Sequence, residues 1–212
     1  MRSERTLPRI SLARAACAAV LALAASATPA VAQQDWPSKP IRFYVGFPPG
    51  GSTDIITRVL SQKLQERLGQ PFIVEQKVGG TGVIANDAVA KAAPDGYTMV
   101  LLTGGHPGTA AVMRKLPYDP VNDFGMVSTV IAYPMVMSVA AQSPIQSLPD
   151  LIARAKAKPG TLSFSSAGPG SLHHLFGEWM NIEAGTSMIH VPFKGAAPAM
   201  TEVLAGRVDV II

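Results

Sequence analysis

The chain has 212 residues, with 18 lysines and arginines, 14 aspartates and glutamates and one cysteine, which gives a formal net charge of +4. Most of that charge lies in the first 32 residues, where there are four arginines and one glutamate, so the rest of the chain is nearly balanced. A balanced surface lacks the basic excess that neutralises phosphates, and nucleic acid is therefore excluded as an expected partner.

Residues 1–32 have the pattern of a secretory signal sequence. The arginines precede an apolar run, Ala15–Ala25, and the small-x-small triplet Ala30–Ala32 that a signal peptidase cuts. The run is too short for a permanent membrane span, although an uncleaved anchor is the alternative. Cys17 lies inside this segment, so cleavage after Ala32 would remove the cysteine, and with it disulfides, thiol catalysis and cysteine-ligated metals. We expect a soluble periplasmic protein.

Beyond residue 32, short β-type runs alternate with helical stretches. Ile56, Leu60, Leu64 and Leu68 recur every four positions, which predicts one apolar stripe on a helix that Gly69 ends. Helices are predicted at Ser52–Leu68, Val83–Ala92, Leu148–Ala157, Leu172–Ala184 and Ala197–Ala205. Strands are predicted at Ile41–Gly46, Phe72–Glu75, Tyr97–Thr103, Met126–Tyr133, Met135–Val139, Leu162–Ser165, Met188–Val191 and Val208–Ile212. The alternation predicts an α/β fold of mainly parallel sheets covered by helices on both faces.

Two lobes are expected after the signal segment. The long stretch from Met126 to Ala140, interrupted by Pro134, is expected to be extended and to connect the two lobes. We therefore place one lobe at residues 33–130 and the other at 131–212. The chain stops at Val210–Ile212, inside a predicted strand and without a polar tail. Termini usually lie at the surface, and we therefore expect a truncated product with an incomplete second lobe.

Four loops rich in glycine and hydroxyl side chains follow predicted strands, beginning at Phe47, Thr103, Ser165 and Val191. Open α/β sheets bind ligands at the carboxyl ends of their strands, so these loops are expected to converge on one cleft. Glycine lets the backbone approach a ligand, and free N–H groups at a helix start attract anions. No lysine follows the glycines of the first loop, which excludes a nucleotide-binding P-loop. Asp54 in that loop is equally well explained as a helix N-cap.

Catalytic interpretations have little support in the sequence. There is no Gly-x-Ser-x-Gly elbow, and the histidines at 106, 173, 174 and 190 lack the spacing of metal ligands on a helix. We therefore expect no catalytic residue, no metal and no cofactor. The enzyme alternative, a periplasmic hydrolase or transferase, would use Ser171 with His173 or His174.

A set of ordered motifs resembles the Bug (TctC-like) receptors of tripartite tricarboxylate transporters. The motifs are Trp36–Ile41, Phe47–Asp54, Ala93–Tyr97, Leu116–Pro120 with Asp123 and Phe124, Val191–Gly195 and Ala205–Asp209. The resemblance implies a two-lobed periplasmic-binding-protein fold of the Venus-flytrap type 2. It further implies a monomeric receptor that captures a small di- or tricarboxylate, or a related organic acid, for membrane transporter components. A ligand-sensing partner of a signalling kinase, built on the same fold, is the alternative.

The resemblance also implies which residues bind. In that family, backbone amides, hydroxyls and ordered water hold the carboxylate. Carried over by position, the binding residues of the first lobe are Gly50, Gly51, Ser52, Thr53, Asp54, Thr103, Gly104 and His106. Those of the second lobe are Ser165, Ser166, Gly170, Ser171 and His174, with Lys194 and Gly195 nearby.

Overall fold

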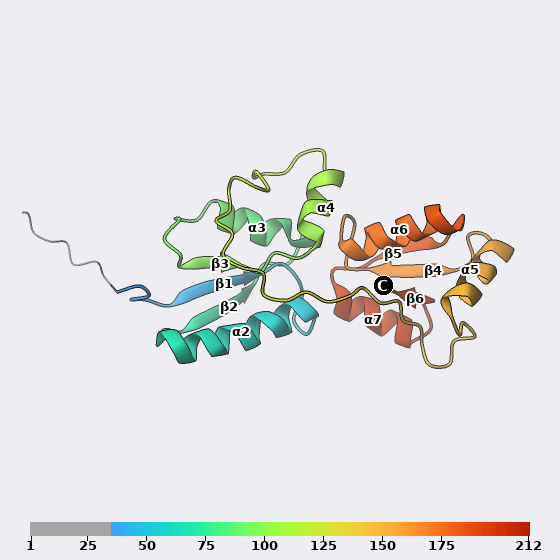
Figure 1. The fold of residues 1–212 in the computed structure, drawn as a ribbon, viewed down its shortest axis with the longest axis horizontal. Coiled ribbons are helices and arrows are strands. Elements are labelled where there is room, and N and C mark those ends of the chain that lie inside the picture. Colours follow the sequence, from blue (N-terminus) through green and yellow to red (C-terminus); the bar gives the residue numbers. More distant parts are fainter. Residues whose placement is uncertain (1–34) are drawn as a thin grey trace, which may run out of the picture. The chain divides into compact units, whose positions relative to one another are not determined.

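The computed structural model describes residues 35–212, so the predicted signal segment and its cleavage point lie outside the described residues. Residues Pro37–Ile212 form one unit, which contains two three-stranded sheets (Figure 1). Strand order is β2-β1-β3 in the first sheet and β5-β4-β6 in the second, and every strand pair within them is parallel. The predicted α/β class with parallel sheets is confirmed. The predicted lobe boundary at residue 130 stays a prediction.

The first sheet consists of β1 (Ile41–Val45), β2 (Phe72–Gln76) and β3 (Thr98–Val100). Helix α2 (Ser52–Leu68) packs on β1 and β2, while α3 (Val83–Ala90), preceded by a 3₁₀ turn at Gly80–Gly82, packs on β1 and β3. The leucine stripe of α2 meets the sheet as its spacing predicts, because Leu60, Leu64 and Leu68 pack against a core of Ile41, Phe43 and Phe72. The helix ends at Gly69, whose φ of 70° is the left-handed conformation that glycine accepts without strain.

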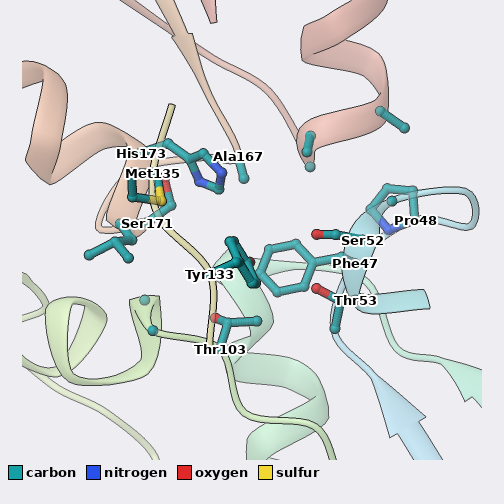
Figure 2. Close-up of a pocket in the computed structure, with 17 residues that line it drawn as sticks. Phe47, Pro48, Ser52, Thr53, Thr103, Tyr133, Met135, Ala167, Ser171 and His173 are labelled. Atoms are coloured by element: carbon teal, nitrogen blue, oxygen red, sulfur yellow. The ribbon is translucent and has the colours of Figure 1, made fainter. Parts of the chain in front are cut away.

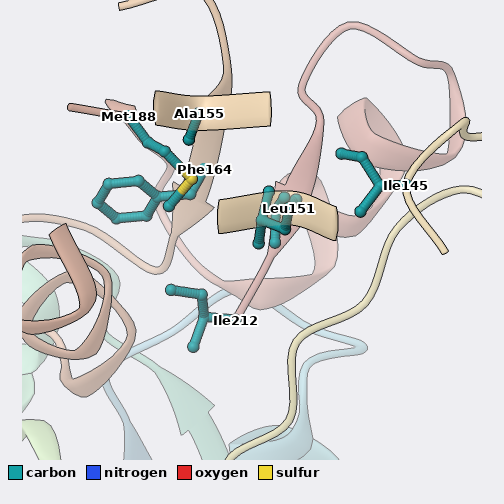
Figure 3. Close-up of a cluster of buried hydrophobic side chains, with 7 residues drawn as sticks. Ile145, Leu151, Ala155, Phe164, Met188 and Ile212 are labelled. Carbon is teal, nitrogen blue, oxygen red and sulfur yellow. The ribbon is translucent and has the colours of Figure 1, made fainter. Parts of the chain in front are cut away.

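The second sheet consists of β4 (Ser163–Ser166), β5 (Ile189–Pro192) and β6 (Val210–Ile211). The accompanying helices are α5 (Leu148–Ala157), α6 (Leu172–Ala184) and α7 (Ala196–Leu204). Phe164 is fully buried in the core of this half, among Leu151, Ala155 and Met188 (Figure 3). Helix α6 lies against Phe164 at Gly177, where a Cβ atom would come within 2.1 Å of the ring. A side chain at this position would therefore have to displace the helix or the ring.

The two strands predicted at Met126–Tyr133 and Met135–Val139 are wrong. The segment is extended but pairs only once among the described residues, through an antiparallel bridge in which the N–H groups of Ser138 and Ile211 each donate to the other's carbonyl at 2.8 and 2.9 Å. Val127 is 86% exposed and Val136 is 64% exposed. An apolar run does not become a strand unless a neighbouring strand satisfies its backbone groups, and Pro134 has no N–H to offer one.

The segment that follows β3 also differs from the prediction. The predicted strand Tyr97–Thr103 is reduced to Thr98–Val100, and a helix that was not predicted, α4 (Gly105–Val112), begins soon afterwards. Its sequence holds two glycines and a proline, which disfavour a helix in isolation. The helix packs closely against the neighbouring loop, and this packing requires glycine at position 108. A Cβ atom at Gly108 would lie only 2.9 Å from the carbonyl oxygen of Gly170. Within residues 35–212, none of the helices has the length and apolarity needed to cross a bilayer.

Candidate functional site

The N-terminal ends of four helices border one pocket (Figure 2). The pocket is lined by Phe47, Pro48, Gly51, Ser52 and Thr53 around the start of α2, by Thr103–Gly105 at α4, by Ala167 and Ser171–His173 at α6, and by Gly195–Ala197 at α7. Tyr133 and Met135, from the extended segment, complete the lining. Backbone N–H groups in the first turn of a helix have no partner within the helix, and the helix dipole gives that end a partial positive charge.

Three of these helices begin at a glycine that cannot cap them. Gly51, Gly104 and Gly195 occupy the N-cap positions of α2, α4 and α7, and no side chain caps these helices. Helix α6 differs, because the hydroxyl of Ser171 accepts a hydrogen bond from the backbone N–H of His174 at 3.3 Å. The glycine caps leave room for a ligand beside the backbone. The arrangement therefore suits an anion that accepts hydrogen bonds from several helix starts.

None of the lining residues has a side chain that is charged throughout the neutral pH range. The acidic residue of the first loop, Asp54, lies behind the wall and is not part of the lining. Its carboxylate accepts hydrogen bonds from the N–H of Gly50 at 3.0 Å, Nε of Arg58 at 3.0 Å and Nε2 of Gln76 at 2.8 Å. Burial acts to raise the pKa of Asp54, but the bonds from Arg58, Gly50 and Gln76 together hold it below its ordinary value. Asp54 is therefore an ionised anchor of this loop.

The loop after β4 is held by histidines and a serine instead of a carboxylate. Ser166 Oγ lies 2.6 Å from Nε2 of His190 and accepts a hydrogen bond from the N–H of Gly168 at 3.1 Å. The ring of His190 stacks on that of His174 with centroids 4.0 Å apart, and Nδ1 of His174 accepts from the N–H of Gly170 at 3.2 Å. Burial and the neighbouring His174 lower the pKa of His190, while Glu178 acts in the opposite direction. This wall thus depends on His190, an imidazole that burial keeps neutral until the pH is lowered.

His106 belongs to a buried cluster outside the pocket. The side-chain amide of Asn86 approaches Nδ1 at 3.2 Å, and Nε2 lies 2.9 Å from the carbonyl oxygen of Pro120. An amide nitrogen donates and a carbonyl accepts, so this ring accepts at Nδ1 and donates at Nε2. Tyr118 and Phe124 pack around it with ring centroids at 6.0 and 5.4 Å. Both nitrogens are used inside the fold, and the structure gives His106 a positioning role for the loops that follow α4.

The structure brings seven of the expected binding residues to the pocket and leaves the other eight away from its lining. Those in the lining are Gly51, Ser52, Thr53, Thr103, Gly104, Ser171 and Gly195. Those outside it are Gly50, Asp54, His106, Ser165, Ser166, Gly170, His174 and Lys194. Of these, Ser165 is completely buried, and Lys194 is exposed. The enzyme alternative also lacks its pairing, since within the described chain Ser171 Oγ bonds a backbone N–H and neither imidazole.

The sequence did not single out several residues that line the pocket. Phe47, Pro48 and Ala167 belong to loops that it did identify, whereas Tyr133 and Met135 come from the segment that it predicted as strands. His173 was named only for the enzyme alternative, whereas His174 was the histidine that the resemblance implied; adjacent residues at a helix start point in different directions, so the sequence does not tell which one faces the cleft. Figure 2 shows the His173 ring next to Ala167 in the pocket wall. No cluster of potential metal ligands occurs within residues 35–212.

Comparison with known proteins gives consistent matches over most of the chain. The family model described as tripartite tricarboxylate transporter family receptor matches residues 56–212. Protein BugT of Bordetella pertussis is 40% identical over 190 residues, which cover 89% of this chain and 58% of BugT. The fold is similar to that of an R. palustris protein solved with adipate, with 36% identity and a TM-score of 0.80 over 83% of this chain and 59% of that one.

A further solved structure agrees with these matches. MatC from Rhodopseudomonas palustris, with bound malate, has 30% identity and a TM-score of 0.76 over 82% of this chain and 60% of that one. The chain thus spans about three fifths of the length of the relatives it matches. These neighbours are receptors and binding proteins, which supports the expectation of a binding protein and not an enzyme.

Proposed function

Because the chain belongs to the family of tripartite tricarboxylate transporter receptors, we propose that its pocket captures a small organic carboxylate in the periplasm for delivery to the membrane components of such a transporter. The observation that carries the proposal is the meeting of four helix N-termini in one pocket whose lining holds no lysine, arginine, aspartate or glutamate. An anion is the ligand that such a site favours, since the helix starts carry partial positive charge.

The physical basis is a set of preorganised donors. Hydrogen bonds to an ionised carboxylate are about twice as strong as those between neutral groups, and donors that are already in place lose little entropy on binding. Several such bonds, from Ser52 and Thr53 of α2 and from the backbone at Gly104 and Gly195, would account for a micromolar affinity, about 8 kcal/mol. Adipate and malate, which two solved relatives contain, are the first ligands to test.

The apolar part of the lining restricts the rest of the ligand. Phe47, Tyr133 and Met135 line the pocket together with the helix starts, and Figure 2 labels all three side chains. Such rings pack on methylene groups, whereas a ligand polar along its whole length would lose hydrogen bonds to water there. A short aliphatic acid with charged ends therefore fits the lining better than a sugar acid does.

The proposal is tested by calorimetric titration of the purified chain with adipate, malate and glucuronate. We expect heat with adipate or malate and weaker or absent heat with glucuronate. A Ser52→Asp variant places a negative charge at the pocket edge of α2, where two like charges about 4 Å apart repel by roughly 4 kcal/mol. Binding should fall by at least about a hundredfold, although an acidic residue at a helix start favours the helix itself.

The matched control adds the same charge elsewhere on the same helix. Gln62→Asp lies on an exposed position of α2, outside the lining, and should leave the affinity within about twofold. Absence of heat with every carboxylate, from a chain whose circular dichroism shows it folded, would contradict the proposed function. Equal loss of affinity in Ser52→Asp and Gln62→Asp would contradict the location of the site.

A further inference from the structure

His173 differs from the other pocket residues in its chemistry. It is the second residue of α6 and, apart from the phenol of Tyr133, the only lining residue with a titratable side chain. Imidazole is also the one side chain in the lining that can become a cation near neutral pH. A pocket otherwise made of neutral groups therefore contains a single group able to match the charge of an anionic ligand.

The ring of His173 has no hydrogen-bond partner among the described residues, and its Nδ1 atom is enclosed by protein. The other three histidines are all engaged. His106 bonds Asn86 and Pro120, His174 accepts from Gly170, and His190 lies in hydrogen-bonding contact with Ser166. A buried nitrogen without a partner is unfavourable, so the unpaired Nδ1 of His173 favours binding of a group that the described residues do not supply.

The protein around this ring disfavours its charged form. Burial lowers the pKa of His173 below its ordinary value, and burial is the one cause of the shift. The charged and titratable groups on the elements around it are His174 and Glu178 on α6, His190 on β5 and Lys194 in the loop before α7. Two of them, His174 and Glu178, act on His190 but not on His173. Tyr133, on the extended segment, faces the same pocket. No fixed charge therefore compensates an imidazolium at this position until a ligand brings one.

We propose that His173 takes up one proton from solvent when a carboxylate enters the pocket and then forms a charge-assisted hydrogen bond to it. This inference rests on the proposed function, since it concerns the same ligand. One N–H bond forms on the ring as a hydronium ion or a buffer acid gives up the proton, and this proton returns to solvent when the ligand leaves. Rotation about the Cβ–Cγ bond presents either ring nitrogen to the pocket, because the two orientations of the ring have nearly the same shape.

The consequence is a binding affinity that depends on pH in a defined direction. A carboxylate within hydrogen-bonding distance favours the charged imidazole, so the pKa of His173 is higher in the complex than in the free chain. The added affinity is fully present below the free pKa and is lost as pH rises through the pKa of the complex. Between these two values the dissociation constant should increase by up to about tenfold per pH unit.

Calorimetry measures the proton directly. Titration with adipate and with malate at pH 7 in phosphate and in Tris, which differ in ionisation enthalpy, gives the number of protons bound per ligand. We expect an uptake above about 0.2 and up to one proton for the wild-type chain. His173→Gln keeps a polar side chain that cannot ionise, so it should show no uptake and a nearly constant affinity between pH 6 and 8.

Glu183→Gln is the matched control, because it removes an ionisable group at an exposed position of the same helix, outside the lining. It should retain the proton uptake. A direct readout that needs no variant is the NMR titration of the four histidine rings, where only His173 should titrate at a higher pH after adipate is added.

The possible outcomes separate the two proposals. If neither carboxylate binds, the proposed function fails and this inference with it. If a carboxylate binds without proton uptake, or if the uptake persists in His173→Gln, the proposed function stands and the role of His173 is overturned. Uptake that disappears in Glu183→Gln, or a ligand-induced shift on another ring, overturns it as well. Should His173→Gln fail to fold, the ring titrations of the wild-type chain decide.

Discussion

The two loops that face the pocket from β1 and from β4 are fixed by different chemistry. In the first, the carboxylate of Asp54 holds the backbone of Gly50 and is itself held by Arg58 and Gln76. In the second, the loop is held by the hydroxyl of Ser166, which contacts His190, and by the stacked imidazoles of His174 and His190. A carboxylate of lowered pKa stays charged through the neutral range, whereas the imidazole of His190, whose pKa is lowered by burial, becomes charged on acidification. The wall at Asp54 is therefore insensitive to mild acid, and the wall at His190, the responsive wall, is not.

The largest effect on stability should come from removing the ring of Phe164, on which His190 of the responsive wall packs. Phe164 is fully buried, and its ring stacks on His190 with centroids 5.1 Å apart. Phe164→Ala should lower the free energy of unfolding by about 3–5 kcal/mol through lost burial and the cavity left behind. Urea denaturation followed by circular dichroism measures this loss. Leu204→Ala, at a residue that is 62% exposed, is the control and should change stability by less than about 0.5 kcal/mol.

An intermediate loss of stability is expected when the charge of Asp54, which holds the loop after β1, is removed. Asp54→Asn keeps the size of the side chain but removes the charge that Arg58 and two further donors satisfy, so the free energy of unfolding at pH 7 should fall by about 1–3 kcal/mol. Since the pKa of Asp54 is lowered by folding, its contribution is present above the ordinary value of 3.8 and is lost as pH falls below it. The difference between variant and wild type should therefore shrink in acid.

A surface ion pair provides the control for that experiment. Glu66→Gln breaks the contact of Glu66 with Lys63, whose side chains are 51% and 68% exposed, and should change stability by a few tenths of a kcal/mol at most. If Glu66→Gln proves as destabilising as Asp54→Asn, the special anchoring role of Asp54 is wrong.

A smaller effect is expected where the two halves touch. Thr81 has a φ of 55°, the left-handed conformation that a β-branched residue rarely adopts, and its hydroxyl donates to the carbonyl of Pro169 at 2.9 Å. Thr81→Val removes this bond and keeps the backbone conformation unfavourable, so stability should fall by about 1 kcal/mol. Thr81→Ser retains the hydroxyl and should lie within a few tenths of a kcal/mol of wild type. Thermal denaturation of the two variants gives the comparison, and equal losses would show that the hydrogen bond contributes nothing.

The smallest effect is a local loosening of the responsive wall on mild acidification. Folding lowers the pKa of His190, so the unfolded chain binds the proton more readily and the contribution of His190 is lost as pH falls below about 6.5. Hydrogen exchange, corrected for its intrinsic pH dependence, should show reduced protection of residues 166–175 between pH 7.5 and 5.5. Residues 50–58 should keep theirs. Parallel changes in both segments would contradict the contrast between the walls.

Much of the fold was predictable because its determinants are local. The leucine stripe and Gly69 defined α2 within the sequence, and the alternation of strand-like and helical runs defined parallel α/β sheets. Helix α4 was not predictable, because its glycines and proline disfavour a helix and only packing against Gly170 and the start of α6 stabilises it. The strands expected between Met126 and Val139 failed for the converse reason, because local apolarity was present without a partner strand.

The candidate site, like the fold, has features that local sequence determines and features that only tertiary packing determines. The sequence by itself determined that glycine-rich and hydroxyl-bearing loops lead into helices, since turn and capping chemistry depends on neighbours along the chain. Only the tertiary structure decided that His173 and not His174 lies in the pocket, that His106 is used internally, and that Tyr133 joins the lining. The direction of a side chain at a helix start depends on how the helix is rotated against its sheet, and contacts between residues distant in sequence set that rotation.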